Sequence, residues 1–360
     1  GTDATICQEG TTTLGCGDDV AGYTYTWTEP VAGALSDVND PNPDINVEIL
    51  TNDANANNSN PGNVNYTFTL TTNRGGCTTS DDVVITIYPR LNGTETLYEC
   101  QGDGAAINSG GNKQGQTPAT GTGWSWTPDA GNPAGGSLDD SNIQSPTFST
   151  SNFGTYIYDL SYTSPDGCTA PYQSTIVVPE RPVVSAGADD EICVPDNGFT
   201  FAGSITVGAG TWTKESGPDP VVFDDVNDPL TTVNGLQDGN CYVFRWTGVN
   251  GTDGGGADVC TVFDEIQICK MTAPNANIDQ NVCGLSTTLA ANATQNAGET
   301  GTWTQVSGPT TVTFSPDVNT PAATVSNMIA TDAGIEYVFR WTITNTNCTE
   351  SDDVSITVFE

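Results

Sequence analysis

Alternation of apolar and polar residues is the clearest pattern in this sequence. Residues 336–342 read Glu-Tyr-Val-Phe-Arg-Trp-Thr, with an aromatic side chain at every second position, and residues 241–247 read Cys-Tyr-Val-Phe-Arg-Trp-Thr. A period of two predicts a β-strand with one buried face, because successive side chains point to opposite sides of a sheet. Shorter versions at residues 66–70 and 156–160 predict the same strand twice more.

Cysteines recur in step with this strand, at intervals of about 90 residues. An early set and a late set stand at Cys7, Cys100, Cys193 and Cys283, and at Cys77, Cys168, Cys260 and Cys348. An immunoglobulin-like β-sandwich contains about 100 residues, whereas most short repeats are below 50. The sequence therefore predicts an all-β protein of four tandem immunoglobulin-like sandwich domains. We call them repeats 1 to 4, at residues 1–90, 91–181, 182–271 and 272–360. Short, proline-containing joints predict an elongated, semi-stiff rod.

Eleven cysteines in such a register indicate an oxidising, extracellular environment. We expect each early cysteine to bond the late cysteine of its own repeat, closing a loop of about 65 to 70 residues and contributing about 4 kcal/mol. The expected pairs are Cys7–Cys77, Cys100–Cys168, Cys193–Cys260 and Cys283–Cys348. A zinc site is disfavoured, because CxxC spacing is absent.

Three cysteines lie outside this scheme. Cys241 and Cys269 both point away from the core face of two successive strands, so we expect them to bond across an antiparallel pair. Cys16 is left over. It is either a buried thiol or the partner of a cysteine in another chain or in a missing segment.

The same antiparallel register predicts two cross-strand ion pairs. It places Arg245 opposite Glu265, and in repeat 4 it places Arg340 opposite Asp353. Such pairs contribute only about 0.2–1 kcal/mol, but they test the register.

The chain is strongly acidic, with 8 Lys and Arg against 44 Asp and Glu, a net charge of −36, and no histidine. This charge disfavours binding to nucleic acid and to anionic membranes and favours solubility. The lack of histidine excludes the common nucleophilic triads. No apolar run is long enough to insert in a membrane. The chain starts at Gly1 rather than Met and shows no signal peptide, so we expect a mature or excised piece.

An Asp-x-Asn triplet occurs once in each repeat and is followed by a proline. It predicts either a turn held by Asx hydrogen bonds or a calcium site built from carboxylate and amide oxygens. Calcium is the one candidate cofactor, and the Gly and Glu of an EF-hand loop are absent. The residues concerned are Asp37, Asn39, Asp140, Asn142, Asp225, Asn227, Asp317 and Asn319.

Tryptophans also recur at one position per repeat, namely Trp27, Trp126, Trp212 and Trp303. This regularity favours the core tryptophan of a sandwich over a sugar-stacking site. Trp124 is the exception. It shares the face of Trp126 and could either join the core or stack on a glycan.

Residues 301–309, Gly-Thr-Trp-Thr-Gln-Val-Ser-Gly-Pro, and residues 210–218, Gly-Thr-Trp-Thr-Lys-Glu-Ser-Gly-Pro, each precede the aromatic strand. In this they resemble the PKD-like and immunoglobulin-like repeats of giant surface proteins of Bacteroidota, which include gliding-motility adhesins and surface filaments. The resemblance is close in repeats 3 and 4 and looser in repeats 1 and 2. It implies a non-catalytic extracellular stalk that is exported by the type IX secretion system.

Together, these observations predict a structural and adhesive repeat protein of the cell surface, forming a stalk or the subunit of a filament. Its expected partners are further copies of itself or other surface proteins. The alternative is a glycan-binding accessory region of a secreted polysaccharide-degrading enzyme, with Trp124 as the place of contact.

Overall fold

The computed structural model describes residues 3–7, 12–15, 17, 19–50, 64–88, 93–107, 124–163 and 169–360. The chain forms two compact units. Unit 1 contains residues 1–180 and 252–259, and unit 2 contains residues 181–251 and 260–360.

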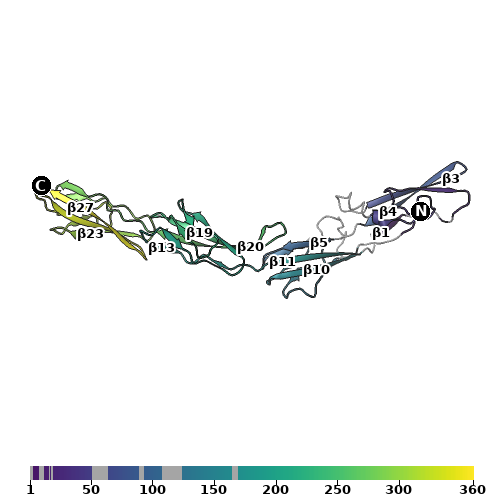
Figure 1. Ribbon diagram of the computed structural model, residues 1–360, viewed down its shortest axis with the longest axis horizontal. Helices are drawn as coiled ribbons and strands as arrows, with labels where there is room; N and C mark the ends of the chain where they lie inside the picture. The colour runs from purple at the N-terminus through teal and green to yellow at the C-terminus, as the bar shows by residue number, and fades with distance from the viewer. Residues whose placement is uncertain are drawn as a thin grey trace. The chain divides into compact units, whose positions relative to one another are not determined.

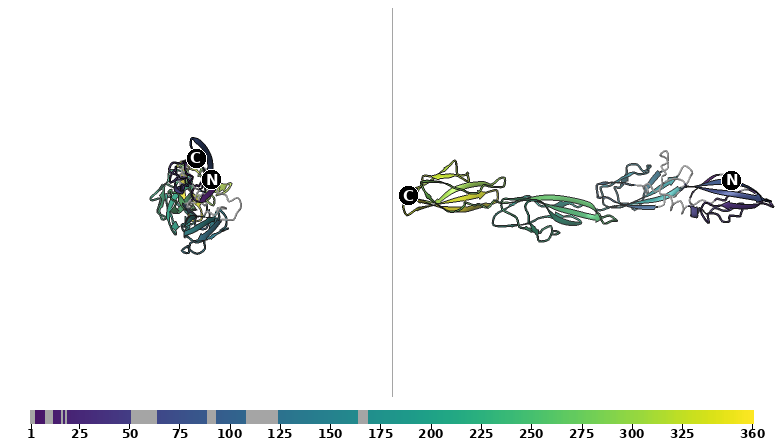
Figure 2. Two further views of the ribbon diagram at one scale, coloured as in Figure 1. Left: turned by 90° about the vertical axis from the view of Figure 1, so that its right-hand side faces the viewer. Right: turned by 90° about the horizontal axis from the view of Figure 1, so that it is seen from above.

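Every repeat contains a four-stranded sheet of the same strand order. The first strand of the repeat pairs with the last, the last with the penultimate, and the penultimate with the strand that carries the tryptophan. The first strand runs parallel to the last, whereas the other neighbours are antiparallel. Long strands of these sheets are labelled in Figure 1, and Figure 2 shows them running lengthwise along each repeat.

Strands of unit 1 alternate between long sheet strands and short ones. In repeat 1 they are β1 (Ala4–Cys7), β2 (Thr24–Thr28), β3 (Val64–Arg74) and β4 (Cys77–Tyr88). In repeat 2 they are β5 (Gly93–Tyr98), β6 (Gly104–Ala106), β7 (Trp124–Pro128), β8 (Ser137–Leu138), β9 (Thr147–Ser149), β10 (Gly154–Thr163) and β11 (Thr169–Val178).

Repeats 3 and 4 follow the same plan. Repeat 3 contains β12 (Val184–Ser185), β13 (Asp190–Ile192), β14 (Gly198–Thr200), β15 (Ser204–Ile205), β16 (Ala209–Ser216), β17 (Val222–Phe223), β18 (Thr232–Asn234), β19 (Cys241–Thr252) and β20 (Asp258–Lys270). Repeat 4 contains β21 (Gln280–Cys283), β22 (Ser286–Thr288), β23 (Thr300–Ser307), β24 (Thr313–Ser315), β25 (Thr324–Ser326), β26 (Ile335–Thr344) and β27 (Thr349–Phe359).

A second, three-stranded sheet faces the first in repeats 2, 3 and 4, with the orders β6-β9-β8, β14-β18-β17 and β22-β25-β24. In the described part of repeat 1, two isolated bridges, Thr13–Asp44 and Leu35–Ile45, take its place. The predicted all-β fold of immunoglobulin-like sandwiches is therefore confirmed, with three or four strands in each layer.

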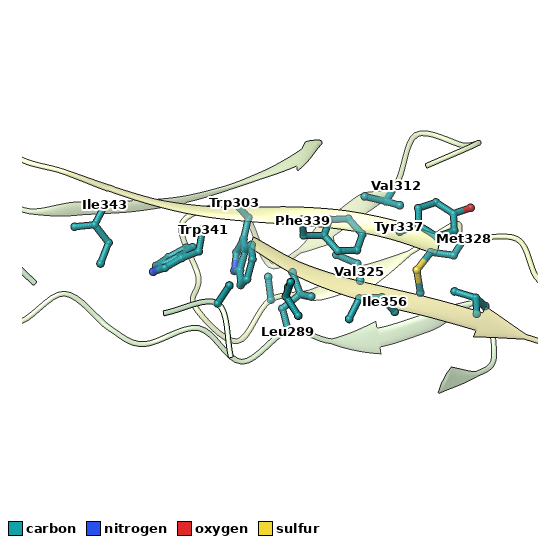
Figure 3. Close-up of a cluster of buried hydrophobic side chains, with 14 of the residues drawn as sticks. Leu289, Trp303, Val312, Val325, Met328, Tyr337, Phe339, Trp341, Ile343 and Ile356 are labelled. Atoms are coloured by element: carbon teal, nitrogen blue, oxygen red, sulfur yellow. The ribbon is translucent and has the colours of Figure 1, made fainter. Parts of the chain in front are cut away.

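Four separate hydrophobic cores fill these sandwiches, one in each repeat. The predicted aromatic strands supply them from one face, since Tyr337, Phe339 and Trp341 are fully buried whereas Arg340 between them is exposed. Figure 3 shows these side chains packed with Trp303 and Ile356 in repeat 4. Met271, the last residue that we assigned to repeat 3, packs into the core of repeat 4.

Repeats 3 and 4 make room for a second tryptophan in the core by using glycine on the neighbouring strand. Trp303 and Trp341 lie directly opposite each other, with ring centroids 5.1 Å apart. A Cβ atom at Gly301 would lie only 2.1 Å from Cζ2 of Trp341, and one at Gly210 would lie 2.0 Å from Cζ2 of Trp246. Glycine is therefore required there for space.

Repeats 1 and 2 solve the same packing problem in the opposite way. The residues opposite their core tryptophans are Leu70 and Leu160. Where repeats 3 and 4 have glycine two residues before the core tryptophan, repeats 1 and 2 have Tyr25 and Trp124. A large side chain on one strand thus accompanies a smaller one on the other, which keeps the core volume similar.

The first aromatic residue of each repeated strand uses its hydroxyl to hold the preceding chain. Such tyrosine corners occur in many immunoglobulin-like sandwiches. Its hydrogen bonds join Tyr66 Oη to Leu50 O (3.0 Å), Tyr156 Oη to Asn152 O (3.1 Å), Gln237 N to Tyr242 Oη (2.8 Å) and Ile329 N to Tyr337 Oη (2.9 Å).

Candidate functional site: the joint between repeats 3 and 4

The early and late cysteines of a repeat lie at opposite ends of its four-stranded sheet. Cys283 ends β21, and parallel pairing places it beside Phe359 at the end of β27. Cys348 precedes β27, 11 residues before Phe359 (359 − 348). At about 3.3 Å per residue, that separation is about 36 Å, far beyond the reach of a disulfide.

The structure instead contains a disulfide between repeats. Cys193, directly after β13 in repeat 3, bonds Cys348 in the β26–β27 turn of repeat 4, with their Cα atoms 5.4 Å apart. Both residues belong to unit 2. We call this disulfide the staple.

Three of the four expected pairings within a repeat are therefore wrong. Cys193–Cys260 and Cys283–Cys348 are excluded by the staple, and Cys7–Cys77 is excluded because Cys77 is a free, exposed thiol. The physical reason is the parallel first strand, which carries the early cysteine away from the late one. In the fourth pair, Cys100–Cys168, Cys100 is disulfide-bonded, and Cys168 lies outside the described residues, as does Cys16.

Polar contacts surround the staple on the side where the chain passes from repeat 3 to repeat 4. Asn296 Nδ2 donates to the carbonyl oxygen of Lys270 at 2.7 Å. The carboxylate of Glu299 accepts from the backbone N–H of Thr272 at 2.7 Å and from its hydroxyl at 2.6 Å. Gln295 lies against Gly239, so a Cβ atom there would be 2.7 Å from its Oε1. The loop before β23 thus docks on the end of repeat 3.

Lys270 anchors the same end of repeat 3 from within. Its side chain is nearly buried, and Nζ donates to the carbonyl oxygen of Leu236 at 3.0 Å and lies 2.8 Å from a carboxylate oxygen of Asp238. A buried ammonium is stable only when it is paired and hydrogen-bonded in this way. The end of repeat 3 is therefore a built surface rather than a loose linker.

The turn of the preceding β19–β20 hairpin has an equivalent position. Its tip, residues 252–259, groups with unit 1 rather than with the rest of repeat 3. A Cβ atom at Gly254 would lie 3.9 Å from Tyr98 Oη, at the end of β5. Cys100, just after β5, and Cys260, just after the hairpin tip, are both disulfide-bonded. These cysteines occupy the places that Cys193 and Cys348 occupy in the staple.

The remaining disulfide prediction is confirmed. Cys241 bonds Cys269 within repeat 3, with Cα atoms 4.0 Å apart. Arg245 Nη2 lies 2.6 Å from Glu265 Oε1. Both observations match the predicted register of the last two strands.

In repeat 4 the register prediction is confirmed by backbone pairing as well. Arg340 lies directly opposite Asp353, and its Nε and Nη2 donate to the two carboxylate oxygens at 2.7 and 2.8 Å. These hydrogen bonds hold the pKa of Asp353 below its usual value of 3.8. A carboxylate with a lowered pKa in the folded state stabilises that state above its unfolded pKa, and this stabilisation disappears as the pH falls through the folded pKa.

Replacing Asp353 with Asn should therefore lower the free energy of unfolding of repeat 4 at neutral pH by about 0.2–1 kcal/mol, because both side chains are largely exposed. The difference from the wild type should disappear as the pH is lowered below 3.8. Urea titrations at several pH values measure it, with Asp332→Asn, an exposed carboxylate of the same repeat, as the control. An equal effect of the control would contradict the role of the pair.

The Asp-x-Asn triplets form turns that hold the core tryptophans. In all four, the Asp Oδ1 accepts the backbone N–H of the Asn two residues later, at 2.8–2.9 Å. The carbonyl of the middle residue accepts the backbone N–H of the core tryptophan. These bonds are Trp27 N to Val38 O, Trp126 N to Ser141 O, Trp212 N to Val226 O and Trp303 N to Val318 O. Each indole N–H also donates to a carbonyl two or three residues further on.

The Asx turn thus explains why the triplet recurs beside the tryptophan. Within the described ranges, no three His, Cys, Asp or Glu residues are grouped so that they could hold a metal ion. Calcium binding by the triplets stays a hypothesis without support from this geometry.

We expect the melting temperature to be the same in EDTA and in calcium, because a ligand that binds only the folded state would raise it. Differential scanning calorimetry measures this. Asp317→Asn keeps an acceptor oxygen for the turn but removes the charge, so it is the matched control. A calcium-dependent rise that this substitution abolishes would contradict the expectation.

The tryptophan predictions separate clearly. The four core tryptophans are buried as expected, with exposures of 1–3%. Trp124 is also buried, at 6% exposure, and belongs to the core of repeat 2. It therefore has no exposed face for a sugar, and the glycan-stacking hypothesis at Trp124 is wrong. The physical reason is the space left by Leu160 on the neighbouring strand.

Residues 276–358, nearly all of repeat 4, match a family model of the PKD domain, in the form named after the KIAA0319-like protein. The mouse dyslexia-associated protein KIAA0319-like protein is 37% identical over 103 residues, which are 26% of this chain. The matched segment spans about a tenth of that protein, 10% of its length.

Whole-chain comparison with solved structures finds distant similarity. The insect immune protein hemolin is 10% identical, with 99% of this chain and 97% of that chain covered, at a TM-score of 0.32. Drosophila N-cadherin EC1-4 is 10% identical, with 99% and 98% covered, at a TM-score of 0.30. Scores of this size carry no argument about function.

Within the part of the chain that the structure describes, no helix has the length and apolar character needed to span a membrane.

Proposed function

We propose that the chain is a non-catalytic, extracellular structural and adhesive repeat protein that serves as a cell-surface stalk or as the subunit of a surface filament. The observation that carries this proposal is the staple between repeats 3 and 4. It joins two successive domains covalently at a second point, which a tether under tension needs and a binding module does not.

The strand order of the repeats supports a load-bearing role. Because the first and last strands are parallel neighbours, the chain enters each repeat at one end of the sheet and leaves at the other. Tension on the two ends of a repeat therefore pulls these strands along each other, so that the ladder of hydrogen bonds resists as a group.

The staple also limits how far the chain can extend. Its two cysteines are 155 residues apart in sequence. Force that reaches Cys193 passes through the disulfide to Cys348, so the intervening residues are not stretched even when repeats 3 and 4 unfold. Disulfides of this kind persist in oxidising, extracellular environments.

Several further observations favour the proposal. The sequence has no histidine, and repeat 4 matches a PKD domain model. The acidity suits a long, exposed, soluble chain. Copies of the same chain or other surface proteins would be its partners. The Bacteroidota origin and the type IX export route stay predictions from sequence resemblance.

Single-molecule pulling of the whole chain from its two ends tests the proposal. With the disulfides intact, the fully unfolded chain should be shorter than after reduction by at least the 155 residues that the staple closes off, about 560 Å at about 3.6 Å per residue. The same extension with and without reductant would contradict the load-bearing role of the staple.

A further inference from the structure

Two cysteines in the described ranges, Cys77 and Cys283, are free and exposed. Cys77 is the first residue of β4, directly after the β3–β4 turn, and lies opposite Arg74. Cys283 is the last residue of β21, at the far end of its parallel pairing with β27. Each thiol thus lies at one end of the four-stranded sheet of its repeat.

These positions are those of the two halves of the staple. Cys283 stands at the end of the first strand of repeat 4, as Cys193 does in repeat 3. Cys77 stands at the start of the last strand of repeat 1, as Cys348 does in repeat 4. In the staple, the early cysteine of one repeat bonds the late cysteine of the repeat that follows it. Repeat 4 therefore presents an unused early cysteine, and repeat 1 an unused late one.

We propose that Cys283 of one copy of this chain bonds Cys77 of a second copy, so that copies join head to tail through the same kind of joint that connects repeats 3 and 4. This inference rests on the proposed function and specifies how the filament is assembled. Because the two joined surfaces differ, the contact does not close on itself, and repetition produces a fibre.

The surfaces beside the two thiols correspond to those in contact at the observed joint. There, the loop before the tryptophan strand of repeat 4 docks on the end of repeat 3. The corresponding loop of repeat 1 exposes Val20 by 50% and Tyr23 by 38%. At the end of repeat 4, Leu285 is 55% exposed and Ile329 is 42% exposed. Apolar side chains of this size at both ends favour burial against a partner over exposure to water.

Access to both sulfur atoms is open. A Cβ atom added at Gly75 or Gly76, beside Cys77, would meet no atom within 4 Å, and the same holds at Gly284 beside Cys283. Arg74 lies over the ring of Tyr23, 5.1 Å from its centroid, and so links the Cys77 turn to the exposed loop.

Formation of this bond is an oxidation, with a small-molecule disulfide such as oxidised glutathione as the oxidant. The Cys283 thiolate attacks one glutathione sulfur, forming a mixed disulfide and releasing the first glutathione thiol. The Cys77 thiolate of the second copy then attacks the Cys283 sulfur and releases the second thiol. Two electrons pass to the glutathione disulfide, and the two cysteine protons end on the two released thiols.

Incubation of the full chain with oxidised and reduced glutathione tests the proposal, in a Cys16→Ser background so that this unassigned cysteine cannot contribute. Non-reducing gels and mass photometry should show a ladder of species at multiples of 37.5 kDa that collapses on reduction. Cys77→Ser or Cys283→Ser alone should abolish every species above the monomer. A mixture of the two variants should stop at the dimer, since each has one reactive end.

Tryptic mass spectrometry identifies the bond, because residues 75–90 and 271–340 are released as peptides with one cysteine each. The dimer should contain these two peptides linked to each other. A monomeric chain with two titratable thiols, or a peptide linked to its own kind, would overturn head-to-tail assembly. A pulling result that agrees with the staple, without a ladder, would reject the assembly alone and leave the proposed function standing.

Discussion

Replacing Cys193 and Cys348 together with serine is expected to lower the free energy of unfolding of unit 2 by about 5 kcal/mol. The chain-entropy relation predicts this value for a loop of 155 residues, because the disulfide restricts the unfolded chain. A loss of this size is a large part of the stability of an ordinary domain. Urea unfolding followed by tryptophan fluorescence measures it.

The matched control removes the other disulfide of unit 2, Cys241–Cys269. Its 28-residue separation predicts a smaller loss of about 3.5 kcal/mol. The two double variants should also differ in kind. Loss of the staple should separate the unfolding of repeats 3 and 4 into two transitions, whereas loss of the bond within repeat 3 should not. Equal losses and one shared transition in both variants would contradict a coupling role.

Gly301→Ala is expected to destabilise repeat 4 by about 3 kcal/mol or more, although alanine is usually neutral or favourable in place of glycine in a strand. The new methyl group would lie 2.1 Å from Cζ2 and 2.5 Å from Cη2 of Trp341. That ring is fully buried and lies against Trp303, so it cannot move aside without disturbing the core. Chemical denaturation of repeat 4 measures the effect.

A second substitution turns this into a test of the packing itself. Trp341→Leu reproduces the residue that repeats 1 and 2 have at this position. Alone, it should leave a cavity and cost about 3 kcal/mol. In its presence Gly301→Ala should cost little, because the clashing ring atoms are gone. The two effects should therefore be strongly non-additive, and simple additivity would show that the clash is relieved elsewhere.

Within the site, sequence reasoning succeeded wherever the answer depended on neighbouring residues of one or two strands. The outward-facing Cys241 and Cys269, and the pairing of Arg340 with Asp353, follow from strand alternation and a single hairpin register. Trp124 was ambiguous because its fate depends on a residue about 36 positions away. The presence of Leu160, where repeats 3 and 4 have tryptophan, was the available signal.

Sequence alone determined that this protein is a series of four β-sandwiches, because a period of two and a repeat of about 90 residues are properties of the chain itself. It did not determine which cysteines bond, because early and late cysteines recur at the same interval whether each pair lies within one repeat or joins two. Only the tertiary structure decided this. Parallel pairing of the first strand with the last carries Cys283 to one end of its sheet and leaves Cys348 at the other, beside Cys193 of the preceding repeat.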